Sequence, residues 1–287
     1  MSGTGDVRYL YDGTWEGLLC CVYESVYGRE VPAAICAQHD AEPSLFQDRW
    51  ISSDAERARR VSRSIPEKIC PQAAVLVRDV FCSCAPDREM LILRFLLFGY
   101  KRGRQACYMR GHAYVAPLYE AQRHLANEVH LLLGFLRFSD VGGVLVATIT
   151  PKNFVLPYLR EHFCGRYAAE EFLIFDKRHG AALVWQAHRA SLIPLEALEL
   201  PPPDADEAQF RALWKRFYEA IGIRQRENPV CRRTHCPVRY WENMTEFQDL
   251  GTETAGLPRR LRAETGTAGA RTGTALPLQD VRRLGGA

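Results

Sequence analysis

One long helical pattern constrains this chain more than any other feature. Over residues 113–136 the apolar side chains recur at steps of three and four, the period of an α-helix with one buried face. The apolar positions are Val115, Leu118, Tyr119, Leu125, Ala126, Val129, Leu132, Leu133 and Leu136. The segment Gly134–Phe138 then leads into a stretch rich in β-branched residues. The sequence therefore predicts a long amphipathic helix that runs into a strand.

The residues before this helix predict two short strands and then a mainly helical region. Prolines separate the helical pieces, because proline cannot donate the hydrogen bond that continues a helix. We expect such breaks at Pro66 and Pro71, and a buried helix around the apolar run Met90–Phe98. The expected elements are strands at 7–11 and 33–37, a helix at 15–27, a loop over 38–50 and helical pieces over 53–101.

The residues after the long helix predict a small sheet and a closing helix. The whole pattern indicates an α+β fold, a helix-rich single domain over residues 1–249 with a small, mainly antiparallel sheet. Residues 250–287 contain too few large apolar side chains to offset the entropy of ordering, so we expect a disordered basic tail. The expected elements are strands at 141–149, 171–175, 181–185 and 191–194, a helix at 151–163 and a helix that starts at Asp204.

Composition places the chain among ordinary globular proteins. Hydrophobic residues make up 47% and charged residues 25%, and no apolar run is long enough to cross a membrane. The polar N-terminus lacks the pattern of a signal peptide, so we expect a cytoplasmic protein. The net charge is +3, and the last 38 residues account for it with six arginines against three acidic residues. Any nucleic-acid interface must therefore be a local basic patch.

Titratable side chains beside the apolar stripe of the long helix are the first candidate site. Glu128 and His130 are two residues apart and so point about 200° apart on a helix, whereas His124 and Glu128 share a face. An enzyme could use Glu128 and His130 as catalytic residues, with Asp12 or Arg137 brought close by folding. The alternative is a surface pair and a half-buried histidine.

Basic segments that contain aromatic residues are the second candidate site. Arginine and lysine can contact phosphates, and aromatic rings can stack on unpaired bases. The candidate nucleic-acid-binding residues are Lys101, Arg102, Arg104 and Arg110 in the first segment, and Arg232, Arg233, Arg239, Tyr240 and Trp241 in the second. The alternative is a solvated loop.

The ten cysteines do not form a recognisable metal-binding pattern. Cys231 and Cys236, with His235 between them, could supply zinc ligands, and Cys82 and Cys84 could supply others. The spacing is irregular and no Cys-x2-Cys pair occurs, so we expect thiols and no metal or cofactor. The phosphate-binding, dinucleotide-binding, serine-hydrolase, zinc-protease and zinc-deaminase motifs are also missing from the sequence.

Several blocks along the chain resemble a family of bacterial DNA metabolism or repair proteins whose core is a domain of unknown function. The resemblance covers roughly residues 7–248 and rests on the order and spacing of the blocks. The blocks are Tyr11–Leu19, Asn127–His130, Gly134–Phe138, Pro151–Phe163, Phe172–Arg178, Asn228–Pro229 and Pro237–Trp241.

The resemblance implies a connection with DNA through the proteins that accompany the family. Its members are typically paired with a radical-SAM protein, and some are fused to a uracil-DNA-glycosylase-like domain. We therefore expect an accessory protein of DNA repair or modification that binds nucleic acid and acts with a radical-SAM partner. A nucleic-acid-processing enzyme and a structural protein-interaction module are the alternatives. The positions that the resemblance singles out are Asp12, Glu16, Glu128, His130, Arg137, Asp176 and Arg239.

Overall fold

The first predicted strand lies at the centre of a small parallel sheet. A computed structural model describes residues 6–200, 202–223 and 226–247, which group into two units: 6–128 with 152–155, and the remainder. In the first unit, β1 (Val7–Tyr11) pairs in parallel with β2 (Ala34–Ala37) on one side and with β3 (Gln47–Trp50) on the other. A short 3₁₀ turn, η1 (Gln38–Asp40), lies between β2 and β3.

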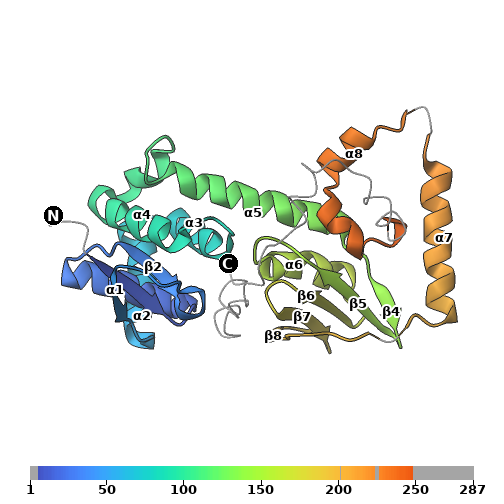
Figure 1. Ribbon diagram of the computed structural model, residues 1–287, viewed down its shortest axis with the longest axis horizontal. Coiled ribbons are helices and arrows are strands. Elements are labelled where there is room, and N and C mark those ends of the chain that lie inside the picture. Colours follow the sequence, from blue (N-terminus) through green and yellow to red (C-terminus); the bar gives the residue numbers. More distant parts are fainter. Residues whose placement is uncertain (1–5, 201, 224–225, 248–287) are drawn as a thin grey trace. The chain divides into compact units, whose positions relative to one another are not determined.

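Helices surround this sheet and supply most of the core of the first unit (Figure 1). They are α1 (Trp15–Gly28), α2 (Ala55–Lys68), α3 (Pro71–Cys82), α4 (Arg88–Arg102) and the 3₁₀ segment η2 (Gly103–Tyr108). Helix α1 packs on β1 and α2, and α4 packs on β2. Tyr9, Tyr11 and Phe95 are fully buried among the helices and the sheet. Burial of these large rings stabilises the unit.

Residues that follow β1 set the start of α1. Thr14 caps the helix by accepting a hydrogen bond from the Gly17 amide at 3.0 Å, and Asp12 in turn accepts bonds from the Thr14 amide and hydroxyl. These bonds satisfy amide donors that a helix start leaves open. Gly13 has a φ of 80°, which glycine adopts without strain.

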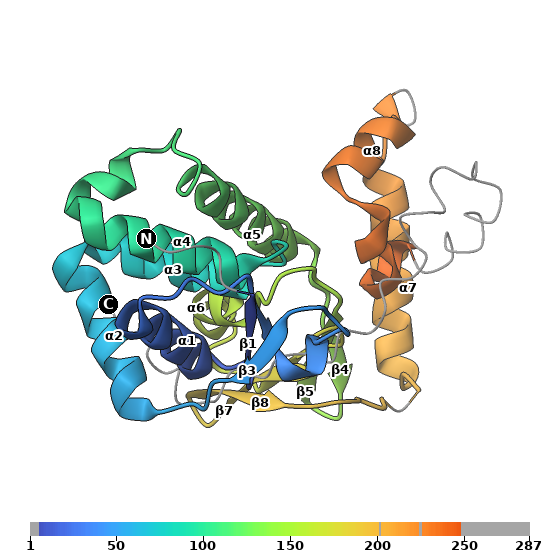
Figure 2. The same cartoon turned by 60° about the vertical axis from the view of Figure 1, so that its left-hand side comes forward.

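The second unit contains a five-stranded sheet with the order β4-β5-β6-β7-β8 (Figure 1, and turned by 60° in Figure 2). Neighbouring strands are antiparallel except β5 and β6, which are parallel and joined through α6 (Leu156–Arg166). Helix α6 packs on β7 and β8. The strands are β4 (Ser139–Val141), β5 (Val144–Ile149), β6 (Phe172–Asp176), β7 (Ala181–Gln186) and β8 (Arg189–Pro194).

Two helices and a 3₁₀ segment complete the described part of the second unit. They are α7 (Ala205–Ile221), α8 (Pro229–His235) and η4 (Val238–Asn243). The long predicted helix is α5 (Ala116–Phe135), and its residues belong to the first unit up to Glu128 and to the second unit from Val129.

The α+β class and the mainly antiparallel character of the larger sheet are confirmed. Three local expectations are wrong. The loop over 38–50 contains η1 and β3, α2 continues through Pro66, and α6 begins at Leu156 rather than at Pro151. That residues 1–249 form one domain stays a prediction, and the tail 250–287 lies outside the described residues. Within the described residues, no helix is long and apolar enough to cross a membrane.

Gly17 in the first turn of α1 provides a test of this arrangement. A Cβ at this position would lie 2.3 Å from Asp12 Oδ1 and 2.9 Å from Ser53 Oγ, so Gly17→Ala has to displace the Asp12 side chain. We expect Gly17→Ala to lower the free energy of unfolding by about 1–3 kcal/mol, although alanine favours helix formation more than glycine does. Thermal unfolding of Gly17→Ala measures this loss. Gly28→Ala, at the other end of the same helix, meets no atom within 4 Å and should not lower the melting temperature.

Candidate nucleic-acid interface

Glu128, the centre of the enzyme hypothesis, is a buried acceptor of hydrogen bonds. Its side chain accepts from the amide of Lys152 at 3.0 Å, and from the amide and side chain of Asn153 at 2.7 and 2.6 Å. Asn153 also accepts a bond from the Cys84 amide. A buried carboxylate needs such partners, because an unpaired charge in the interior is strongly destabilising. Glu128 therefore has a structural role, because its hydrogen bonds hold residues 152–155 in place.

The two histidines of this helix do not join Glu128. His130 is exposed and lies two residues further along α5, so its side chain leaves the helix on a different face. His124 lies 3.8 Å from Glu120 rather than in the expected pair with Glu128. The catalytic group expected from Glu128 and His130 therefore does not assemble on α5.

Asp12 lies at the carboxyl end of β1, where it links two loops. Besides its bonds with Thr14, it accepts a hydrogen bond from Ser53 Oγ at 2.6 Å. Burial alone would raise the pKa of Asp12, but the hydrogen bonds from Ser53 and Thr14 outweigh it and lower the pKa. Glu16 lies in the first turn of α1, where an acidic side chain interacts favourably with the helix dipole. Both residues thus stabilise the start of α1.

Arg137 forms an ion pair within the second unit. Its guanidinium contacts the buried carboxylate of Glu246 at 2.7 and 3.3 Å and lies 5.4 Å from the ring centre of Trp214. Burial raises the pKa of Glu246, but bonds from Arg137 and Trp214 lower it below its ordinary value. Arg137 therefore connects the end of α5 with α7 and the segment after η4, and the structure does not show it in a catalytic arrangement.

Asp176 and His179 form an acid–histidine pair in the second unit. The Asp176 side chain is fully buried at the end of β6, and Oδ2 lies 2.7 Å from His179 Nδ1. Oδ1 accepts bonds from the amides of Arg178 and His179, both at 3.1 Å. Burial raises the pKa of Asp176, and the bonds with His179 oppose that effect only in part. The geometry fits a turn held by an aspartate between β6 and β7.

The cysteine and histidine residues near α8 do not form a metal site. Cys231 Sγ lies 3.5 Å from His235 Nδ1, whereas Cys236 is buried with its sulfur 3.8 Å from Met244 Sδ. Among the residues that the structure describes, no three metal-binding side chains gather in one place.

The second predicted basic segment turns its rings inward. Tyr240 and Trp241 are 2% and 9% exposed, so neither ring is open to a base. Arg239 lies over Tyr240, and Arg232 lies over Trp241 at 5.4 Å. Arg233 donates to the carbonyl of Pro229. This arrangement corrects the interpretation of Tyr240 and Trp241 as stacking platforms, because their rings face the protein's own core and arginines.

The first predicted basic segment stays on the surface of the first unit. Lys101 and Arg102 are exposed in the last turn of α4, and Arg104 is exposed in η2. Arg110 is exposed too, with its guanidinium 4.5 Å from the ring centre of Tyr119. Four basic side chains are therefore exposed on this part of the surface.

A further basic surface lies on α2, which was not singled out as a site from the sequence. Asp54 caps α2, and Ala58, Val61 and Ile65 form its buried stripe at steps of three and four. This stripe leaves the remaining positions to solvent. They carry five basic residues, Arg57, Arg59, Arg60, Arg63 and Lys68, against two acidic residues, Glu56 and Glu67.

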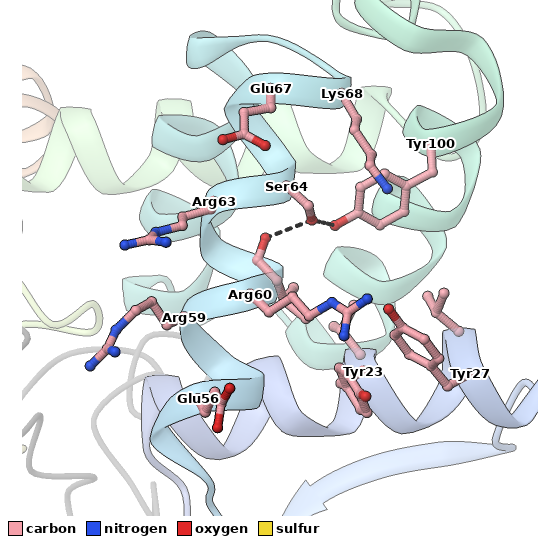
Figure 3. A pocket seen from close by; sticks show the side chains of 13 residues that line it. Tyr23, Tyr27, Glu56, Arg59, Arg60, Arg63, Ser64, Glu67, Lys68 and Tyr100 are labelled. Carbon is pink, nitrogen blue, oxygen red and sulfur yellow. Dashed lines mark hydrogen bonds between the residues drawn. The ribbon is translucent and has the colours of Figure 1, made fainter.

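A hollow of about 710 Å³ lies along α2 between α1 and α4 (Figure 3). We call it the α2 groove, and it is lined by Arg59, Arg60, Arg63 and Lys68 together with Tyr23, Tyr27, Tyr100 and neighbouring residues. Arg60 and Lys68 point toward tyrosine rings, whereas Arg59 and Arg63 point away from them on the outer side of α2. The groove thus combines cations with aromatic surface.

The tyrosines of the α2 groove are ordered by specific contacts. Tyr23 and Tyr27 are four residues apart on α1 and stack with ring centres 4.2 Å apart. The guanidinium carbon of Arg60 lies 5.1 Å from the centre of the Tyr27 ring, and Tyr27 is 55% exposed. Tyr100 exchanges a hydrogen bond of 2.7 Å with Ser64, and burial raises its pKa, so it adds no negative charge. Tyr27 therefore offers an aromatic surface to solvent beside a cation.

Glu128→Gln separates the structural role of this side chain from a catalytic one. Three donors converge on the Glu128 carboxylate, and glutamine would replace one of its acceptor oxygens with an NH2 donor. We therefore expect Glu128→Gln to lower the free energy of unfolding by about 2 kcal/mol or more. Thermal unfolding measures this loss. Glu120→Gln is the control, because Glu120 is 64% exposed in the same helix and should change stability by under about 0.5 kcal/mol. A Glu128→Gln protein with an unchanged melting temperature would contradict the structural assignment.

Comparison with known proteins gives a family but no activity. Searches among curated proteins and among solved structures found no match. A family model does match residues 86–246, from the start of α4 to the segment after η4. This range includes Glu128, Arg137 and Tyr100, whereas α1 and α2 precede it. Because the match covers more than half of the sequence, this chain belongs to the DUF4130 family, a domain of unknown function.

Proposed function

We propose that this protein binds nucleic acid through the α2 groove and serves as an accessory factor in DNA repair or modification. The observation that supports the proposal is the set of exposed cations on α2, of which Arg60 lies beside the stacked rings of Tyr23 and Tyr27. Arginines interact with phosphates by charge and by paired hydrogen bonds, and tyrosine rings stack on bases of any sequence. Arg60 and Lys68 offer charge beside the tyrosine rings, and Arg59 and Arg63 extend the basic surface to the outer side of α2.

The net charge of the chain is only +3, so binding to a polyanion requires a local cluster of basic side chains. The α2 groove contains such a cluster. Arg57 is partly engaged by Glu24, but Arg59 and Arg63 have exposed side chains that point outward. Lys101 and Arg102 follow directly after Tyr100 in α4, so the first predicted basic segment adjoins the groove in sequence. A nucleic-acid strand that crosses α2 would therefore meet basic side chains from two helices.

The place of the protein in DNA metabolism is proposed from the resemblance of its sequence blocks. On that basis it acts with a radical-SAM partner, and a uracil-DNA-glycosylase-like protein is a further candidate partner. The cytoplasmic location stays a prediction from the sequence. The enzyme alternative lacks support, because Glu128 accepts hydrogen bonds from Lys152 and Asn153 and His130 does not meet it.

The interaction-module alternative has one observation in its favour. Helix α7 leaves large apolar side chains in solvent, with Phe210 68% and Phe217 52% exposed. Exposed apolar surface of this kind is common at contacts between proteins. Failure to bind any oligonucleotide would favour this alternative over the proposed function.

The groove proposal predicts the effect of removing three charges from α2. Replacing Arg59, Arg60 and Arg63 by glutamine should weaken binding to a labelled single-stranded DNA roughly tenfold or more at 0.1 M salt. The plot of log affinity against log salt should become less steep by about 2, because three phosphate contacts are lost. Fluorescence anisotropy across a salt series measures both quantities.

A matched variant controls for the change in net charge. Arg94, Arg123 and Arg189 are exposed and lie outside the groove, so replacing all three by glutamine removes the same charge. This variant should bind within about threefold of the unmodified protein with nearly the same salt slope. Equal losses in the two variants would contradict a role for the α2 groove, as would oligonucleotide binding that salt does not affect.

A further inference from the structure

Two cysteines from distant positions meet in the core of the first unit. Cys70 immediately precedes Pro71, where α3 begins, and Cys107 lies in η2. Both are buried, with 3% and 6% of their surface exposed, and their sulfur atoms are 2.6 Å apart. Both cysteines are free thiols, and a disulfide bond between them would be about 2.0 Å long. The backbone thus holds the two sulfurs within about 0.6 Å of bonding distance.

We propose that Cys70 and Cys107 are a modification site that closes to a reversible intrachain disulfide in the presence of a peroxide. In this reaction the two thiols lose two protons and two electrons, and a bond forms between their sulfurs. Hydrogen peroxide accepts both, its O–O bond breaks, and two water molecules form. A dithiol reductant reverses the step by forming its own cyclic disulfide and returning both protein thiols. The proposal does not depend on nucleic-acid binding.

The surroundings of the pair explain why it can exist as two thiols in the absence of an oxidant. Burial and the neighbouring Cys70 raise the pKa of Cys107 to about 12. The thiolate is the reactive form of cysteine, so such a thiol reacts slowly near neutral pH. The Tyr119 hydroxyl donates to the carbonyl of Cys107 at 3.0 Å and helps to hold η2 in place. Closure therefore needs an oxidant, whereas the fold already brings the two sulfurs together.

The position of the pair gives the bond a structural consequence. Cys70 follows the end of α2 by two residues, and Cys107 follows Arg104 in η2. A bond between them would join segments 37 residues apart in sequence. It would thereby fix the junction of α2 and α3 against the segment that follows α4.

Peptide mapping of the full chain tests the proposal directly, because trypsin releases Cys70 and Cys107 in two separate short peptides. Cleavage after Lys68 and Arg78 gives residues 69–78 with Cys70, and cleavage after Arg104 and Arg110 gives residues 105–110 with Cys107. Reduced protein is treated with hydrogen peroxide, free thiols are alkylated in denaturant, and the digest is analysed without reduction. We expect the two peptides linked, at their summed mass less two hydrogen atoms, and separated again by dithiothreitol.

Variants and a defined negative result complete the test. The linked peptide should be absent from Cys70→Ser and should persist when the exposed thiols are removed in Cys84→Ser/Cys231→Ser. Recovery of both peptides in alkylated form after peroxide treatment would overturn the proposal. Linkage of Cys70 or Cys107 mainly to other cysteines would also overturn it. Mapping of the unmodified chain decides between these outcomes even if Cys70→Ser does not fold.

Discussion

The hydrogen bonds of one buried carboxylate hold residues 152–155 in the first unit. Glu128 accepts hydrogen bonds from the Lys152 and Asn153 amides and from the Asn153 side chain. Asn153 in turn accepts a hydrogen bond from the Cys84 amide. The Phe154 amide then donates to the carbonyl of Cys82 at 2.8 Å. Residues 152–155 are therefore built into the first unit, although the chain on both sides of them belongs to the second. The same bonds occupy the carboxylate that an acid–base mechanism would have required.

The α2 groove follows from a different constraint, the narrow buried stripe of α2. Only Ala58, Val61 and Ile65 of this helix are buried, so its arginines have to face solvent. The contact of α2 with α1 then places Arg57 over Tyr23 and Arg60 over Tyr27. Neither helix alone provides both cations and rings. The candidate interface is thus a product of helix packing, and its chemistry comes from residues that local patterns classify as an ordinary solvated face.

Local sequence signals predicted the elements with strong periodicity and short turns. Strands β1, β6 and β7 and helices α1 and α5 all agree with the expected segments to within a few residues. These elements are dictated by side-chain period and capping within a few neighbouring residues. Pro66 lies two residues before the end of α2, so the helix does end soon after the proline, as its missing N–H favours.

The features that the sequence could not reveal depend on contacts between distant residues. All four residues of β3 are exposed, so it has no alternating pattern, and Arg8 holds it through paired bonds of 2.7 and 2.8 Å to Asp48. Burial of Tyr240 and Trp241 could not be predicted either, since an aromatic residue beside arginines fits a core edge as well as a stacking platform. The groove was missed for the same reason, because Tyr23 and Arg60 are far apart in sequence.

Photocrosslinking tests the central claim, that nucleic acid binds in the α2 groove, most directly. A single-stranded DNA with photoreactive thymidines would be irradiated with the full chain at saturating concentration, and the adducts located by peptide mapping. The account predicts adducts on the segments that contain Tyr23 and Tyr27 of α1 and residues 55–68 of α2. Adducts confined to residues 226–243, or none at saturation, would contradict it.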